Sequence, residues 1–521
     1  MTVSETREDV SRSAHRRARL DTVDELSRRR FDVLVVGGGI IGAGIAAHAA
    51  RAGLATALVD AGDFGGATSS ASSKLIHGGL RYLRLGDVRL VREAHYERRL
   101  LTTIVAPHLV RRIPFLLPLY RSGPYRPAVV QSGIVLYSLL ARSRLNWLVG
   151  PARAREMVPT LRLEGLRSCA LYADATTNDA RLCLANMRAA AETGACVLNG
   201  AEVVALRSSH GRLAGAEVNV DGEDVAVEAR VVVNAAGPWV DHVRRLEDPH
   251  AGSSVRLSRG AHVLVPADTE WTAALTIPQD GVRVTFAVPW SGMLLLGTTD
   301  SPYEGDPAEV AVGPADAEQI LAEASVALDS ALVTPDRVRA AYAGLRVLPA
   351  GEGESVSARR ETVFTRSPGG MLNVAGGKLT TYRRIALETL DRLRSELGLH
   401  RLDRRPWPLP GAIGLEGVSL PVDLEPDVRS HLLHLYGSLA PEVLAPVAED
   451  PSLLERLHPG GPDIAAQVRY AATHEWARTA EDILRRRTTC FHRGLVDEEV
   501  GTRVERLLAT ASTDGEHRSR R

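Results

Sequence analysis

Three glycines within six residues have the spacing of a phosphate-binding turn. They follow a short apolar run that is typical of a buried strand, and they precede an alanine-rich segment that is typical of a helix. In such a strand–turn–helix unit the first glycine permits a tight turn, the second lets the backbone approach a pyrophosphate, and the third lets helix and strand pack closely. We therefore expect a dinucleotide to be bound by Gly37, Gly39, Ile40, Ile41 and Gly42.

A carboxylate follows at the position that such a unit requires. A second apolar strand, Thr56 to Val59, ends at Asp60, 23 residues beyond Gly37. A carboxylate about 20 residues after the glycines can accept hydrogen bonds from ribose hydroxyls. The order strand, glycines, helix, strand and acid is far more specific than the glycines alone, but it does not separate NAD from FAD.

Three further stretches favour FAD. The serine-rich stretch 63–83 has almost no apolar face, so it leaves room for a ligand and supplies hydroxyl donors. Strand ends at 231–239 and 371–382 carry glycines, and in the second of them Gly376 and Gly377 precede a helix. Backbone N–H groups at that helix start would face the flavin edge that gains negative charge on reduction. Several separate approaches to one elongated ligand suit FAD better than NAD.

Composition excludes several other classes of protein. The chain has 63 basic and 63 acidic residues, so no overall charge predicts a nucleic-acid partner. The cysteines Cys169, Cys183, Cys196 and Cys490 are too scattered for a disulfide framework, and we expect neither a disulfide nor a metal site. No apolar run approaches the roughly 20 residues of a membrane-spanning helix. We expect a cytoplasmic protein.

The rest of the chain predicts an α/β fold with an α+β cap. We expect a mobile N-terminal tail at 1–30 with a short helix near Leu20 to Arg28, and an oxidoreductase region at 31–400. Within that region, a Rossmann-like FAD-binding domain comprises about 31–105, 150–250 and 345–400, with a small antiparallel insertion at Val197 to Val233. An antiparallel-sheet substrate cap comprises about 106–149 and 251–344. A helical C-terminal domain at 401–513 and a disordered tail at 514–521 complete the chain.

Six stretches, in this order along the chain, resemble the FAD-dependent glycerol-3-phosphate dehydrogenases of the D-amino-acid-oxidase-like flavoproteins. One departure is visible, because Gly344-Leu345-Arg346-Val347-Leu348 stands where that family usually has Gly-Val-Arg-Pro-Leu. The matching stretches are ATSSASSKLIHGGLRYL (Ala67 to Leu83), NAAGPWVD (Asn234 to Asp241), FAVPWSGMLLLGTTD (Phe286 to Asp300), AGLRVL (Ala343 to Leu348), GGKLTTYRRIA (Gly376 to Ala386) and HEWARTAEDILRRRT (His474 to Thr488).

The resemblance implies oxidation of sn-glycerol 3-phosphate to dihydroxyacetone phosphate, with hydride transfer to a non-covalently held FAD and electrons passed on to quinone. The chain's only lysines, Lys74 and Lys378, lie inside the matching stretches. The remaining expected FAD contacts are Thr68, Ser69, Ser70, Ser72, Ser73, Lys74, Leu75, His77, Val203, Ala235, Gly237, Gly376, Gly377, Lys378, Leu379 and Thr380.

The same resemblance implies a substrate site rich in cations. Arginine suits phosphate because its planar fork makes paired, charge-assisted hydrogen bonds, although Arg346 can equally lie beside the reacting oxygen. His77 is the first candidate for the base that takes the hydroxyl proton, and His262 is the second. The expected substrate-site residues are Arg81, Tyr82, His262, Arg346, Arg360 and Lys378.

The electron acceptor and the membrane contact stay open. The alternatives are an oxidase that uses oxygen, a related flavoenzyme for another hydroxy or amino acid, and a non-catalytic FAD-binding protein. We further expect that the chain can form a homodimer. Quinone dissolves in the bilayer, so its reduction implies peripheral attachment to the inner face of the cell membrane. Apolar and aromatic residues flanked by Arg111, Arg112 and Arg121 make 111–148 a candidate anchor, and packing inside the cap is the competing interpretation.

Overall fold

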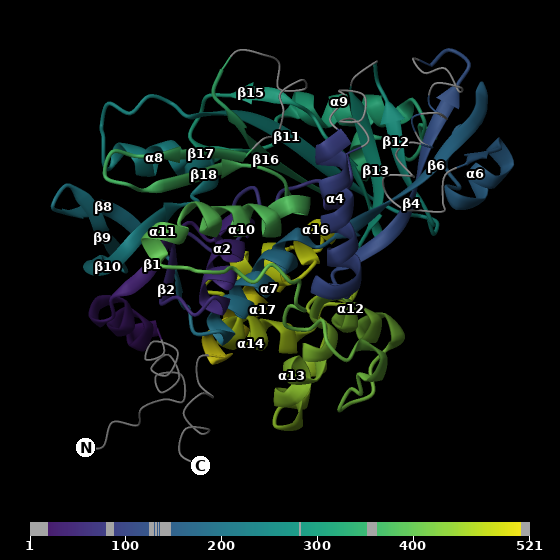
Figure 1. Ribbon diagram of the computed structural model, residues 1–521. Helices are drawn as coiled ribbons and strands as arrows, with labels where there is room; N and C mark the ends of the chain where they lie inside the picture. The colour runs from purple at the N-terminus through teal and green to yellow at the C-terminus, as the bar shows by residue number, and fades with distance from the viewer. Residues whose placement is uncertain are drawn as a thin grey trace.

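Two sheets and a helical C-terminal region form the molecule (Figure 1). The structure is a computed structural model that describes residues 19–79, 88–123, 147–280, 283–351 and 362–511, together with positions 130, 133 and 135. The expected α/β fold with an α+β cap and a helical C-terminal domain is confirmed.

The first sheet is built around the predicted strand–turn–helix–strand unit. Strands β1 (Phe31–Val36) and β2 (Thr56–Asp60) are buried apolar runs that pair in parallel, as strands covered on both faces do. Within the described residues this sheet has eight strands, and its main path is β17–β18–β10–β1–β2–β7. The other elements are α2 (Ile40–Arg51), α7 (Asp179–Glu192), β7 (Cys196–Asn199), α8 (Val240–Arg245), β10 (Glu223–Asn234), β17 (Thr362–Arg366), β18 (Leu372–Gly376) and α10 (Tyr382–Arg392).

A small antiparallel ribbon extends this sheet, as predicted. Strands β8 (Ala201–Ser209) and β9 (Arg212–Val220) pair with each other, and β9 pairs with β10. The two hairpin turns use residues with positive φ, at Gly211 in the first and at Asp221 and Gly222 in the second.

The second sheet forms the cap. Its described part has ten strands, and its longest pairing joins β11 (Val255–Pro266) to β16 (Ala340–Pro349) in antiparallel fashion. Helix α9 (Pro314–Ser325) buries Ile320 and Leu321 against one face of this sheet. The other elements of the cap are β3 (Leu75–Ile76), β4 (Val110–Tyr120), β5 (Leu148–Val149), α6 (Pro151–Met157), β6 (Leu166–Thr177), β12 (Ala274–Pro278), β13 (Val284–Trp290), β14 (Met293–Gly297) and β15 (Ser301–Tyr303).

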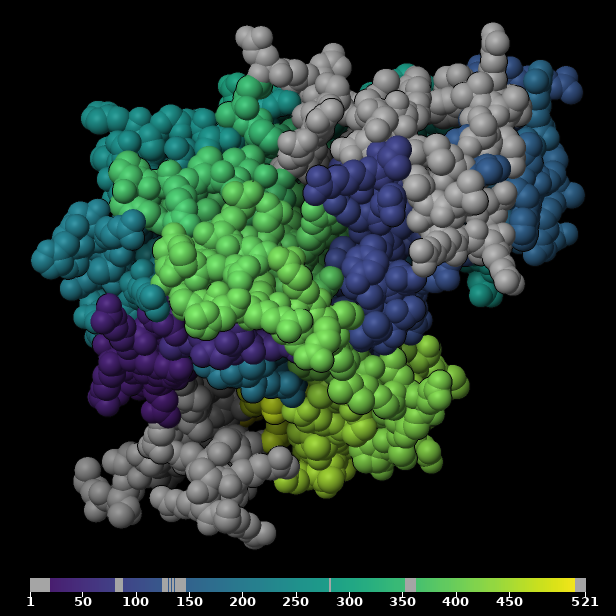
Figure 2. All heavy atoms as spheres, viewed as in Figure 1, coloured from purple at the N-terminus to yellow at the C-terminus, as the bar shows by residue number. Residues whose placement is uncertain are grey.

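The C-terminal region is helical and has its own apolar core, which includes Leu432, Val443 and Val468. In the space-filling view its surface (yellow-green) meets α4 (Val88–Leu100, indigo) without an intervening gap (Figure 2). A backbone hydrogen bond of 2.8 Å from Leu409 N–H to Val105 C=O lies at this junction. Helix α11 (Arg394–Leu397) follows α10 and packs on the first sheet. The helices of the C-terminal region are α12 (Pro426–Tyr436), α13 (Ala440–Leu444), α14 (Ala465–His474), α15 (Ala480–Asp482), α16 (Cys490–Arg493) and α17 (Glu498–Ala511).

The cap sheet differs from the expected domain limits. β6 lies near one end of this sheet, between β4 and β3, although both β6 and β3 were expected in the FAD-binding part. The short helix expected near Leu20 is present at 19–28 and buries Leu26 completely in the core of the first sheet. Leu26 thereby gains apolar contacts that a mobile tail would forgo.

Candidate active site

The glycine turn has the geometry that a phosphate-binding backbone requires. Gly37 has φ +105°, and a Cβ there would lie 2.6 Å from the carbonyl oxygen of Ala235. A Cβ on Gly42 would lie 1.9 Å from the carbonyl oxygen of Gly37, so this glycine lets α2 approach the turn. The first turn of α2 carries no acidic residue, and its positive dipole end is left for an anion.

Asp60 braces the turn. One oxygen of its carboxylate accepts the N–H of Gly38 at 2.5 Å, and the other accepts the N–H of Gly62 at 2.8 Å. Burial raises the pKa of Asp60, and these two hydrogen bonds oppose the rise. The ribose contact expected of this carboxylate stays a prediction.

One cavity of about 1650 Å³ connects the two sheets and contacts most of the predicted residues. Three predicted residues, Gly42, Ser70 and Lys74, do not line it. The predicted residues that line it are Gly37, Gly39, Ile40, Ile41, Asp60, Thr68, Ser69, Ser72, Ser73, Leu75, His77, Val203, Ala235, Gly237, His262, Arg346, Gly376, Gly377, Lys378, Leu379 and Thr380.

Lys74 does not line the cavity, and its side chain instead holds the serine-rich loop by a hydrogen bond to its backbone. Its side chain is 1% exposed, and its Nζ donates to Asp179 Oδ1 at 2.6 Å and to the carbonyl oxygen of Ser70 at 2.7 Å. The ammonium also lies 5.1 Å from the ring centroid of Tyr342. Burial lowers the pKa of Lys74, and Asp179 opposes this. The side chain of Lys74 is thus directed to the buried carboxylate of Asp179, and the cofactor contact expected of this residue stays a prediction.

The serine-rich loop joins the glycine turn to the cap. The N–H of Ile40 donates to Ser69 Oγ at 2.9 Å, and the hydroxyl of Thr68 donates to the carbonyl oxygen of Leu345 at 2.7 Å. The hydroxyl of Ser72 donates to Asp179 at 2.7 Å. The serine-rich loop is therefore tied both to the start of α2 and to β16 of the cap sheet.

Arg346 lies on the cavity wall over a residue that has no side chain. A Cβ on Gly260 would lie 2.4 Å from a terminal nitrogen of Arg346, so only glycine leaves room for the guanidinium. Arg346 pairs with Asp300 at 3.2 Å and donates to Thr298 Oγ1 at 2.8 Å. These partners fix the direction of the cation. Strand β16 continues through Val347, which pairs with Leu257, so the departure from the family's proline leaves the backbone extended.

His262 is a buried, neutral imidazole at the same wall. Its Nε2 lies 2.9 Å from Ser73 Oγ, and its ring stacks on Tyr342 with centroids 5.0 Å apart. Burial lowers the pKa of His262 well below its usual value, and the positive charges of Arg346 and Lys74 lower it further. The ring therefore carries no charge at neutral pH.

His77 and Lys378 also line the cavity. The backbone N–H of His77 donates to Thr380 Oγ1 at 3.1 Å, which ties the serine-rich loop to the helical turn Leu379–Thr381 that leads into α10. Lys378 directly precedes that turn and is buried at the cavity wall. Arg81, Tyr82 and Arg360, also predicted for the substrate site, lie outside the described residues.

Sequence reasoning assigned no role to several residues of the site. Asp179 anchors Ser72 and Lys74. It shares no motif with them and lies more than a hundred positions further along the chain. Asp482 and Arg486 of the C-terminal region also line the cavity. The only indication of a role for these two residues in the sequence was that they belong to the matching stretch at 474–488.

Comparisons with protein-family models identify the class of protein. A family model described as FAD dependent oxidoreductase matches residues 32–383. The chain is therefore an FAD-dependent oxidoreductase, and its residues fit FAD: the glycine turn leaves room for a pyrophosphate and the cavity extends from it to Arg346. A second model, described as the C-terminal domain of alpha-glycerophosphate oxidase, matches residues 386–516.

Relatives that match most of the chain identify the family within this class. A glycerol-3-phosphate dehydrogenase of Mycobacterium leprae is 37% identical, with 94% of this chain and 87% of that protein covered. One of Pseudomonas aeruginosa is 36% identical, with coverage of 88% and 91%. The solved structure of the Bacillus halodurans glycerol-3-phosphate dehydrogenase complexed with FAD superposes with a TM-score of 0.76 at 28% identity, over 96% of this chain and 98% of that one. The chain belongs to the glycerol-3-phosphate dehydrogenase family.

Proposed function

We propose that this protein oxidises sn-glycerol 3-phosphate to dihydroxyacetone phosphate and passes the electrons through FAD to membrane quinone. The observation that carries the proposal is the wall formed by Arg346 and His262, which places a fixed cation beside a neutral imidazole in the FAD cavity. Relatives named for this substrate match 94% and 88% of the chain.

The reaction removes a hydride from C2 of the substrate and a proton from its hydroxyl group. FAD, when bound, would supply the acceptor for the hydride, which carries both electrons of the oxidation. Arg346 reaches across Gly260 toward His262, and its charge lowers the pKa of His262. We therefore assign it to the C2 oxygen, where it stabilises the alkoxide as the proton leaves.

The phosphate requires cations of its own. Lys378 is buried at the cavity wall and is the candidate phosphate partner among the described residues. Its compact ammonium suits a phosphate dianion as a point charge. Arg81 and Arg360 remain proposed phosphate partners on the family resemblance.

Two histidines compete for the role of base. His262 is held neutral, but the positive charges of Arg346 and Lys74 disfavour the imidazolium that a base must become. His77 lines the cavity, is only partly buried, and belongs to the loop that is tied to the start of α10. We therefore assign proton removal to His77, and we assign to His262 the positioning of the substrate hydroxyl.

Membrane attachment is part of the proposal, since quinone lies in the bilayer. Within the described residues no helix has both the length and the apolar composition needed to cross a membrane. β4 is not a free anchor, because Phe115, Leu116 and Leu117 are buried in the cap. Trp147 and Leu148, by contrast, are 51% and 40% exposed at the end of the 111–148 stretch. We assign the attachment to these two side chains.

A double-mixing experiment tests the acceptor. The holoenzyme is first reduced with sn-glycerol 3-phosphate without oxygen and is then mixed with either a soluble quinone or oxygenated buffer. The proposal requires reoxidation by quinone to be the faster by at least about tenfold at equal acceptor concentration. Faster reoxidation by oxygen, with formation of hydrogen peroxide, would identify an oxidase instead.

A further inference from the structure

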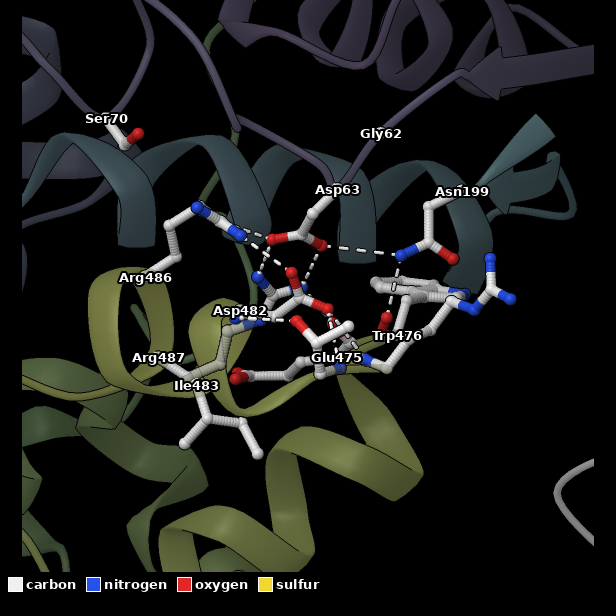
Figure 3. A network of polar contacts seen from close by, with 12 residues as sticks. Gly62, Asp63, Ser70, Asn199, Glu475, Trp476, Asp482, Ile483, Arg486 and Arg487 are labelled. Atoms are coloured by element: carbon white, nitrogen blue, oxygen red, sulfur yellow. Dashed lines mark hydrogen bonds and ion pairs between the residues drawn. The ribbon is translucent and has the colours of Figure 1, made fainter. Parts of the chain in front are cut away.

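Two arginines of the C-terminal region are buried against a single aspartate of the FAD-binding domain. Arg487 donates to Asp63 Oδ1 at 2.8 Å and also contacts Oδ2, and Arg486 contacts Oδ2 through its Nε (Figure 3). The side chains of Arg487, Asp63 and Arg486 are only 0%, 5% and 9% exposed. Buried charges at this depth persist only where partners compensate them.

The charges are balanced within the cluster. Arg486 also donates to Asp482 Oδ1 at 2.7 Å, so two arginines face two carboxylates. Burial alone would raise the pKa of Asp63, but Arg487 and Arg486 lower it below its usual range. Arg487 additionally donates to the carbonyl oxygen of Glu475 at 2.6 Å, which fixes its position within the C-terminal region.

A second contact from the same region reaches the same loop. The Trp476 ring packs edge-on against Phe64, the residue after Asp63, with centroids 5.4 Å apart. Asn199, at the end of β7, donates to the carbonyl oxygen of Trp476 at 2.8 Å and lies beside Asp63 in Figure 3. The loop at 61–66 is thus held by both an ionic and an apolar contact.

That loop is part of the cofactor site. Gly62, Asp63, Gly65 and Gly66 line the cavity. The N–H of Gly62 donates to Asp60, and the N–H of Gly65 donates to the carbonyl oxygen of Gly38 at 3.0 Å. The loop therefore closes on the phosphate turn itself, and any displacement of Asp63 would be transmitted to the backbone groups that face the nucleotide half of FAD.

We infer that the C-terminal region is a structural part of the FAD site: Arg486 and Arg487 position the loop at 61–66 through Asp63 and thereby set how tightly FAD is retained. Asp482 and Arg486 also form part of the cavity wall. This role concerns the cofactor and is independent of the substrate and of the electron acceptor.

FAD release from the purified holoenzyme tests the inference. Free flavin fluorescence is followed after dilution of the wild type and of Asp63→Asn, Arg486→Gln and Arg487→Lys. Asp63→Asn removes the carboxylate that Arg486 and Arg487 share, so its FAD release should be at least about tenfold faster. Arg487→Lys keeps the charge but loses the fork, and should give an intermediate rate.

Arg188→Gln is the matched control. Arg188 on α7 also joins the FAD-binding domain to the C-terminal region, through Glu442 at 3.0 Å, but it does not line the FAD cavity. Its release rate should stay within about twofold of the wild type. Equal acceleration in Arg188→Gln and Asp63→Asn would mean that general domain loosening causes the effect, and it would overturn the inference.

Thermal melting with and without added FAD separates positioning from simple destabilisation. The inference requires the rise in melting temperature caused by FAD to shrink in the Asp63 variant. An unchanged rise and an unchanged release rate would refute it. If Asp63→Asn does not yield folded protein, Arg486→Gln decides the question by the same criteria, because Arg486 is the least deeply buried of the three and Asp63 keeps Arg487 in that variant.

Discussion

At the scale of single residues, the charged groups of the site depend on neighbours that give them either space or a partner of opposite charge. Gly260 allows the guanidinium of Arg346 to lie against β11, and the Asp179 carboxylate allows Lys74 to be buried beneath the serine-rich loop. The sequence predicted Arg346 because it belongs to a matching stretch, and it offered His262 as the second candidate base. It could not predict that Lys74 faces away from the cavity, since its partner Asp179 is distant along the chain.

Replacing Arg346 by alanine should lower kcat for sn-glycerol 3-phosphate by orders of magnitude, because a charged partner of the reacting oxygen contributes about 2–5 kcal/mol. The FAD content should stay near that of the wild type. Arg337→Ala is a suitable control, since Arg337 forms an ion pair with Asp268 and does not line the cavity. Steady-state kinetics with an artificial acceptor measure both variants. Unchanged turnover in Arg346→Ala would place the reacting oxygen elsewhere.

At the scale of elements, the strand–turn–helix–strand unit, the antiparallel ribbon and the helical C-terminal region were all predictable, because each follows from local periodicity and glycine positions. The sheet to which β6 belongs was not. Its sequence, LRSCALYADATT, describes a buried strand but not its neighbours, and β6 pairs with β4 along nearly its whole length. The apolar stretch of β4 was likewise ambiguous between an interface and a core until that pairing was known.

Gly42→Ala should separate α2 from the phosphate turn, because the added Cβ would lie 1.9 Å from the carbonyl oxygen of Gly37. We expect FAD affinity to fall by at least about tenfold. Ala50→Gly, at the far end of α2, is the control: it costs about 1 kcal/mol of helix stability and should leave FAD binding unchanged. Titration of the FAD-free proteins with FAD gives both affinities. Normal FAD affinity in Gly42→Ala would show that close helix packing is not required.

At the scale of the whole molecule, buried histidines make stability depend on pH. Burial lowers the pKa of His48, His95, His108 and His434 to about 3. Each is neutral in the folded chain and takes up a proton only on unfolding once the pH falls below about 6.5. Stability is therefore fully present above that pH and is lost as the pH falls toward 3, by up to about 1.4 kcal/mol per pH unit for each group.

The melting temperature should accordingly fall between pH 6.5 and pH 5, ahead of the titration of most carboxylates. His108→Gln should show a shallower decline, because it removes one of these groups. Differential scanning calorimetry at several pH values measures both curves. A flat wild-type curve across this range would contradict the burial of neutral imidazoles.

Membrane attachment is a second property of the whole molecule. The double variant Trp147→Ser and Leu148→Ser should sediment less with vesicles that contain anionic lipid, since it removes the exposed apolar anchor. Ile413→Ser is the matched control, because Ile413 is 66% exposed but lies in the segment that leads into the C-terminal helices. Equal sedimentation of the wild type and the double variant would rule out this anchor.

The most direct measurement is anaerobic titration of the holoenzyme with sn-glycerol 3-phosphate, followed by the absorbance of the oxidised flavin. We predict stoichiometric loss of that absorbance together with formation of dihydroxyacetone phosphate, and no loss with glycerol, which lacks the phosphate that Lys378 is proposed to hold. Persistent oxidised flavin in the presence of sn-glycerol 3-phosphate, with reduction by an amino acid or another hydroxy acid instead, would contradict the proposed function.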